Sequence, residues 1–183
     1  MYKVLIFGDS LVQKLPVEKC SEKLKFHVEC MPGLKAVEVV DGERLRDGYN
    51  NILTRALEED DYDYCVICLG TNDVNASIKD VVHNLNELCR IVTKRGVVPV
   101  RVFLHGCHDK FNTLYSESCD SKVSVGNGDF EEEDAVFCEY FLGLTRGKAG
   151  SKTDYLEKDG IHLTRLGRKK FVEDIVATIM EVL

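Results

Sequence analysis

Short apolar segments alternate with longer helical segments along this chain, and the alternation constrains the possible folds more than any other feature. Apolar runs predict strands over residues 2–7, 25–30, 64–69 and 97–104. Helical spacing of apolar residues predicts helices over residues 36–58 (with a break near Gly48), 78–94 and 163–182. Strands that alternate with helices form a parallel sheet covered on both faces. We therefore predict an α/β fold in which helices sandwich a mostly parallel sheet.

The last predicted helix follows a long stretch without a regular pattern of apolar residues. One face of the helix is expected to hold Leu166, Phe171, Ile175, Ile179 and Leu183. The length of 183 residues favours one domain over residues 1–183, with an irregular acidic insertion around 106–158. Within it, the run Glu131-Glu132-Glu133-Asp134 is interpreted as a solvated surface. We expect a short helix over about 131–142, because acidic residues favour the first turn of a helix, and a brief fifth strand near 153–156.

Charge and hydropathy exclude several classes of partner. The formal net charge is −7, whereas sequence-independent nucleic-acid binding requires a basic surface, so we expect no nucleic-acid partner. No apolar run approaches the length of a transmembrane segment. The chain begins Met1-Tyr2-Lys3 and runs directly into a predicted strand, from which we expect no signal peptide and a cytoplasmic location.

The eight cysteines are better explained as reduced, buried side chains than as disulfides. Most lie inside apolar segments, as small hydrophobic residues do in a reducing compartment. Cys65 and Cys68 have the spacing of a metal-binding pair, but residues three apart in a strand point to opposite faces. Four residues of types that bind metals follow the fourth predicted strand, namely His105, Cys107, His108 and Asp109. The sequence offers no second group of ligands that would complete a metal site with them. We expect no metal and no cofactor.

Four short motifs carry the residue types of a hydrolytic site. They are Gly8-Asp9-Ser10-Leu11, Gly33 within Met31-Pro32-Gly33-Leu34, Gly70-Thr71-Asn72-Asp73, and Asp159-Gly160-Ile161-His162. Each alone is compatible with an ordinary turn or helix cap. The first three follow predicted strands and the fourth precedes the last helix, so all should lie at the carboxyl edge of a parallel sheet, where such folds bind ligands.

Together these motifs supply the groups that acyl transfer needs. The Ser10 hydroxyl requires a base, and His162 is the side chain suited to neutral pH. Asp159 can orient that imidazole. An oxyanion requires preorganised donors, and the candidates are the Ser10 N–H, the Gly33 N–H and the Asn72 side-chain amide.

In these motifs the chain resembles the SGNH-hydrolase (GDSL esterase/lipase) family over essentially its whole length. Ser10 matches the nucleophile of that family, Gly33 and Asn72 its oxyanion donors, and Asp159 and His162 its final Asp-x-x-His motif. The resemblance implies a three-layer α/β/α, flavodoxin-like fold with a five-stranded parallel sheet. It also implies metal-free hydrolysis of an ester or thioester through an acyl-serine intermediate. The 106–158 region matches no motif of the family.

Three functions are consistent with this sequence. The leading hypothesis is a serine esterase that acts on a small-molecule substrate, namely a small or lipid-like acyl or acetyl ester. The second is a catalytically weak binding or interaction module with the same fold. The third is a nucleotide or phosphate binder that uses the Gly8-Asp9-Ser10 segment at a helix start, and the absence of a glycine-rich phosphate loop counts against it. The sequence gives no basis for an oligomeric state.

Overall fold

The computed structural model describes residues 1–41, 52–102, 136–138, 152–159 and 161–183. Its sheet has five strands, and every neighbouring pair is parallel. In spatial order the strands are β2 (Leu24–Cys30), β1 (Tyr2–Gly8), β3 (Tyr64–Cys68), β4 (Val98–Val102) and β5 (Val136–Cys138). This 2-1-3-4-5 order is the flavodoxin-like one, in which the chain reverses its direction of travel across the sheet between β1 and β3.

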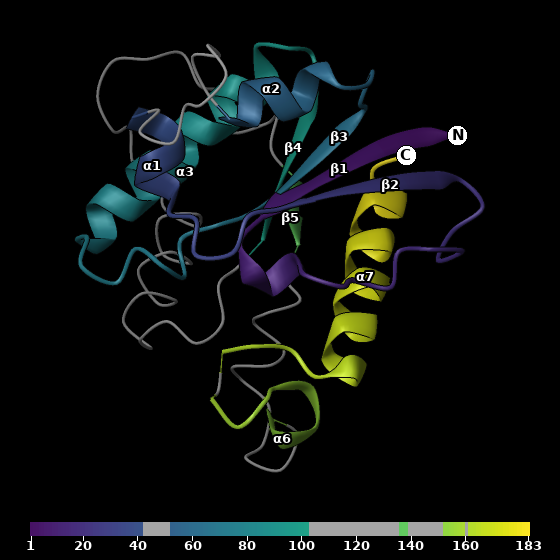
Figure 1. Cartoon of the computed structure of the whole chain (residues 1–183). Helices are drawn as coiled ribbons and strands as arrows, with labels where there is room; N and C mark the ends of the chain where they lie inside the picture. Colours follow the sequence, from purple (N-terminus) through teal and green to yellow (C-terminus); the bar gives the residue numbers. More distant parts are fainter. Residues whose placement is uncertain (42–51, 103–135, 139–151, 160) are drawn as a thin grey trace.

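Helices cover both faces of the sheet, which confirms the predicted three layers. Three of them lie together on one side (Figure 1): α1 (Ala36–Asp41), α2 (Ile52–Glu58) and α3 (Ile78–Thr93). Helix α7 (Arg165–Glu181) covers the other side and contacts β5. The short helices η1 (Ser10–Val12) and α6 (Lys152–Tyr155) follow β1 and precede α7, respectively. A strand order with a reversal next to β1 makes the carboxyl end of β1 the expected ligand site.

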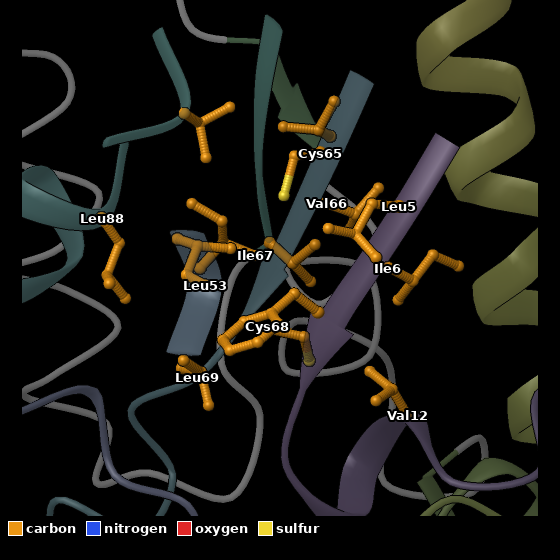
Figure 2. Packing of buried hydrophobic residues seen from close by; sticks show 14 of the residues in the cluster. Leu5, Ile6, Val12, Leu53, Cys65, Val66, Ile67, Cys68, Leu69 and Leu88 are labelled. Carbon is orange, nitrogen blue, oxygen red and sulfur yellow. The ribbon is translucent and has the colours of Figure 1, made fainter. Parts of the chain in front are cut away.

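The core lies on both faces of β1 and β3. Residues 4–7 of β1 have no exposed surface, and all five residues of β3 are buried. Figure 2 shows Ile67 of β3 on the side of Leu53 and Leu88, which come from α2 and α3. Burial on both faces explains why these strands are continuous apolar runs. In the described part of the chain, no helix combines the length and the apolar character that a membrane span requires.

Gly8 allows the ends of β1 and β3 to approach each other closely. A Cβ atom at this position would lie 2.6 Å from the carbonyl oxygen of Cys68. The strand ends are joined there because the Asp9 N–H donates to the same oxygen at 3.3 Å. Only glycine fits without a backbone shift, so this residue fixes where the chain leaves the sheet.

Two predicted elements of the 106–158 region are wrong. The fifth strand is Val136–Cys138, inside the range 131–142 for which we expected a helix, and it pairs with β4. The segment expected to be that strand, near 153–156, instead forms helix α6 up to Tyr155. Elements of three or four residues are too short to show a period, and contacts with distant segments decide their conformation. The acidic run 131–134 and the ligand-type residues 105–109 lie outside the described residues.

Helix α7 buries a set of residues that differs in part from the predicted one, since Gly167 and Val172 are also buried. Phe171, Ile175 and Ile179, spaced by four residues, are fully buried. Leu166 is 51% exposed and Leu183 is 45% exposed, so their assignment to the inner face was wrong. Leu166 lies five positions before Phe171, which turns it well away from the buried stripe, and Leu183 follows the end of the helix.

Candidate active site

The structure brings Ser10, His162 and Asp159 into one hydrogen-bonded chain. The Ser10 Oγ atom lies 3.0 Å from His162 Nε2. On the other side of the ring, His162 Nδ1 lies 2.5 Å from Asp159 Oδ2. About half of the His162 side chain is exposed, so a substrate can reach it. A hydroxyl, an imidazole and a carboxylate in this order form the arrangement that activates a serine nucleophile.

A small hairpin between α6 and α7 presents the histidine. Its base is a bridge between Leu156 and Leu163, and the Glu157 N–H donates to the His162 carbonyl at 2.8 Å. Asp159 also holds the turn, because its Oδ1 atom accepts the Ile161 and His162 N–H groups at 2.9 and 3.0 Å. The hydrogen bond from His162 and these two N–H groups lower the pKa of Asp159 to about 2. Asp159 is therefore ionised at every pH at which a histidine base operates.

Gly167 and Thr164 fix the hairpin to helix α7. Thr164 caps the helix, since its Oγ1 accepts the Gly167 N–H at 3.0 Å. The same hydroxyl donates to the Asp154 carbonyl at 2.6 Å, and the Thr164 N–H donates to the Tyr155 carbonyl at 3.0 Å. A Cβ atom on Gly167 would lie 2.1 Å from that Tyr155 oxygen. Only glycine permits this contact, so helices α6 and α7 together set the position of the imidazole.

Asp9 places Ser10 at the start of helix η1. Its Oδ1 atom accepts the Leu11 N–H at 2.9 Å, which makes Asp9 the N-cap of that helix. The Asp9 side chain is completely buried. The sequence indicated a cap at this position, but it did not indicate a buried carboxylate.

The Asn72 amide links the Ser10 segment to the Gly33 segment. Its Nδ2 atom donates to Asp9 Oδ2 and to the Leu34 carbonyl, each at 3.1 Å. Asn72 therefore lies beside both loops that carry the other candidate oxyanion donors. Because both N–H bonds already have protein acceptors, donation to an oxyanion requires Asn72 to share or release one of them.

The loop that carries Gly33 is held by a turn and by Asp73. The Leu34 N–H donates to the Met31 carbonyl at 3.0 Å, and Gly33 has φ +75°. A positive φ after a proline is typical of a type II turn and favours glycine. The buried Asp73 carboxylate accepts the Ala36 and Val37 N–H groups at the start of α1. The sequence did not predict this contact, because a cap from a distant loop leaves no local pattern.

Burial of Asp9 has an electrostatic consequence. Loss of hydration raises the pKa of its carboxyl group to about 6. The Leu11 N–H and the nearby His162 lower that pKa, whereas Asp73 raises it further. The charge of Asp9 therefore changes within the pH range in which the Ser10–His162 pair would operate.

A pocket of about 200 Å³ opens beside the Ser10–His162 pair. Its lining comes from η1 and the chain that follows, from the hairpin, and from the first turn of α7. The lining residues are Ser10, Leu11, Gln13, Lys14, Glu157, His162, Leu163 and Arg168. Gly33 and Asn72 are absent from this lining, so the pocket lies on the histidine side of the serine.

One cluster with metal-ligand chemistry occurs among the described residues, and it lies elsewhere. His27, Glu29 and Glu59 offer ligand atoms within 4.8 Å of one another. His27 and Glu29 lie in the middle and near the end of the edge strand β2, and His27 Nδ1 lies 2.5 Å from the Tyr62 hydroxyl. This cluster of His27, Glu29 and Glu59 shares no residue with the candidate active site at the carboxyl end of β1. The thiols of Cys65 and Cys68 are both buried, as predicted.

The fold is shared with solved hydrolases of low sequence identity. TesA superposes with a TM-score of 0.69 at 15% identity, over 99% of each chain. The psychrotrophic esterase EstA from Pseudoalteromonas sp. gives 0.65 at 13% identity, over 100% of this chain and 98% of EstA. A GDSL-like lipase from Bacteroides thetaiotaomicron gives 0.65 at 14% identity, over 99% and 89% of the two chains. No model of a known protein family matches this chain, and the comparison with curated proteins also finds no match.

These likenesses establish the architecture. The described residues have the three-layer α/β/α fold of the solved SGNH and GDSL-like hydrolases, in alignments that cover 97–100% of the chain. This confirms the fold that the resemblance of the motifs implied. Activity does not follow from a fold, so the chemistry must be argued from the residues at the carboxyl end of β1.

Proposed function

We propose that this chain is a serine ester hydrolase of the SGNH family. One observation carries the proposal, namely the continuous contact from Ser10 Oγ through the His162 ring to Asp159. The first and fourth motifs, whose Ser10 and His162 lie 152 positions apart in the sequence, thus meet in the order that activation of a serine nucleophile requires. The shared fold of TesA, EstA and the GDSL-like lipase supports the same assignment.

The reaction would proceed through an acyl-serine intermediate. Ser10 Oγ attacks the ester carbonyl carbon while His162 Nε2 accepts the hydroxyl proton. The tetrahedral intermediate collapses, the bond to the alcohol oxygen breaks, and His162 returns the proton to that oxygen. Water then repeats the sequence and releases the acid. Asp159, ionised because of its low pKa, keeps Nδ1 protonated and stabilises the imidazolium.

Three donors would stabilise the negative oxygen of each tetrahedral intermediate. They are the Ser10 N–H, the Gly33 N–H and the Asn72 amide, each of which is typically worth about 100- to 1000-fold in rate. Asn72 can contribute once it releases its bond to the Leu34 carbonyl, while its bond to Asp9 holds the amide in place. Asp9 is therefore a positioning residue for both Ser10 and Asn72.

The substrate would be a small or lipid-like acyl or acetyl ester, or a thioester. The pocket beside Ser10 is small and open to solvent, which favours a compact group on that side. A panel of 4-nitrophenyl esters from acetyl to octanoyl, together with acetylated sugars and an acyl thioester, would test the proposal. We expect hydrolysis of at least one class well above the buffer rate. An enzyme preparation that is folded but inactive on every class would refute the assignment.

A further inference from the structure

We propose that the pocket beside His162 binds a negatively charged group on the alcohol half of the ester. The inference rests on the proposed function, and it names the substrate class: a carboxylated or phosphorylated alcohol in ester linkage. Its basis is the position of the pocket relative to the reacting atoms and the charges that line it.

The direction of proton transfer assigns the pocket to the alcohol. His162 must deliver a proton to the leaving oxygen, so the alcohol leaves on the side of the imidazole. The pocket is lined by Ser10, His162 and Leu163, whereas Gly33 and Asn72 do not line it. The carbonyl oxygen of the substrate would therefore point away from this pocket, towards the candidate oxyanion donors. The alcohol half of the ester would point into the pocket.

Two cations and one anion line the pocket. Lys14 follows η1, Arg168 lies in the first turn of α7, and Glu157 lies in the hairpin. Within the described residues, neither cation has a carboxylate within ion-pair distance. The next two cations of α7 are different, because Lys169 pairs with Glu173 and Lys170 pairs with Asp174. Among the residues that the structure describes, Arg168 and Lys14 thus lie beside the reacting serine without a carboxylate partner.

The backbone at Lys14 adds a second observation. Lys14 has φ +58°, in the left-handed region that disfavours every residue with a side chain other than Asn and Asp. A glycine would adopt this conformation without strain. The strained residue lies four positions after the nucleophile and carries a long cationic side chain into the pocket lining. Local strain of this kind often occurs at ligand sites, but Lys19 has the same φ of +58° and does not line the pocket, so the position of Lys14 in the lining carries the argument.

The cations at the pocket contrast with the negative charge of the whole chain. With a formal net charge of −7, the molecule as a whole repels an anionic substrate. Lys14 and Arg168 reverse that sign at the pocket, and a guanidinium forms paired hydrogen bonds with carboxylate or phosphate oxygens. A neutral alcohol forms at most weaker hydrogen bonds with these groups, because it carries no opposite charge.

Two acetyl esters with similar leaving groups would test the inference. They are 4-acetoxybenzoate, which is anionic, and 4-acetoxybenzamide, which is neutral. We expect kcat/KM to favour the anionic ester by about tenfold, because one charge-assisted hydrogen bond is worth about that factor. The preference should shrink as salt is added, since salt screens exposed charges.

Variants of the lining residues should shift this ratio in opposite directions. Arg168→Gln and Lys14→Gln should each lower the anionic-to-neutral ratio by about three- to tenfold, whereas Glu157→Gln should raise it. Comparing ratios cancels the intrinsic reactivity of the two leaving groups. Lys169→Gln removes a neighbouring cation that does not line the pocket, and it should leave the ratio unchanged.

A second pair of esters tests the assignment to the alcohol. Mono-4-nitrophenyl succinate carries its charge on the acyl half, and 4-nitrophenyl butyrate is its neutral counterpart. We expect the ratio for this pair to be insensitive to Arg168→Gln. Hydrolysis of the neutral esters without any charge preference, or a preference that only the acyl pair shows, would overturn the inference and leave the proposed function intact. A folded protein that hydrolyses none of these four esters and no member of the panel described above would instead refute the proposed function.

Discussion

Replacing Ser10 with alanine is expected to lower kcat for a hydrolysed ester by about 10⁴- to 10⁶-fold. The loss is large because the variant keeps the histidine but has no oxygen that can form the acyl intermediate. Ser10 Oγ has His162 Nε2 as its hydrogen-bond partner at 3.0 Å, so the fold should tolerate its removal. Steady-state release of 4-nitrophenol, with a melting curve for each variant, measures both quantities.

Two controls make this result specific. Ser21→Ala removes a surface hydroxyl that accepts only the Lys23 N–H in the described structure, and it should keep the full rate. His162→Ala should lose about as much activity as Ser10→Ala, and the double variant little more, because the two groups act as a unit. His83→Ala, on the exposed surface of α3, should be silent. A Ser10→Ala protein that retains the wild-type rate would show that hydrolysis uses a different nucleophile.

The second large effect concerns stability and the buried Asp9. We expect the free energy of unfolding of the wild type, relative to that of Asp9→Asn, to fall as pH rises from about 4 to about 6. A pKa moved from 3.8 to about 6 corresponds to a difference on the order of 3 kcal/mol, at about 1.4 kcal/mol per pH unit. Urea unfolding of both proteins at several pH values measures the difference.

The sign follows from proton binding. The folded state keeps its proton on Asp9 up to about pH 6, whereas the unfolded chain loses it near pH 4. Between these values the folded state binds more protons, so each increase in pH favours unfolding. Stability from this group is fully present below pH 4 and is lost by the time pH exceeds 6. The Asn side chain does not titrate, so Asp9→Asn removes this component.

Asp60 provides a control with the opposite sign. Its hydrogen bond from Lys3 Nζ lowers its pKa, so its contribution is present at neutral pH and is lost in acid. Asp60→Asn should therefore weaken the protein slightly at neutral pH rather than in acid, since the pair is at the surface. Equal pH profiles for wild type and Asp9→Asn would show that Asp9 is not a buried titrating carboxyl group.

The central part of the fold could be predicted from sequence because its signals are local. Strands β1 and β3 are apolar runs buried on both faces, and α3 shows clear helical spacing. Strand β5 and helix α6 could not be predicted. Three-residue β5 exists because it pairs with β4, and α6 is held by Thr164 from beyond the hairpin. Neither contact leaves a pattern in the short segment itself.

The candidate site divides in the same way. Parallel topology alone predicts that Ser10, Gly33 and Asn72 share one edge of the sheet. The sequence does not predict the hydrogen bonds that hold the loops at this edge in place. Asp9 holds the Asn72 amide, and Asp73 caps α1 from another loop. Both acids lie within the motifs, where the sequence allows a local turn or cap but does not identify partners that are far away in the chain.

The most direct test of the account is covalent labelling with a fluorophosphonate, followed by peptide mapping. Phosphonates react with a serine that a neighbouring base activates, and EstA, which has the same fold, has been solved inhibited by monoethylphosphonate. We expect one label per chain on the peptide that contains Ser10, and greatly slowed labelling in His162→Ala. A folded wild-type protein that takes up no label, or takes it up equally in Ser10→Ala, would contradict it.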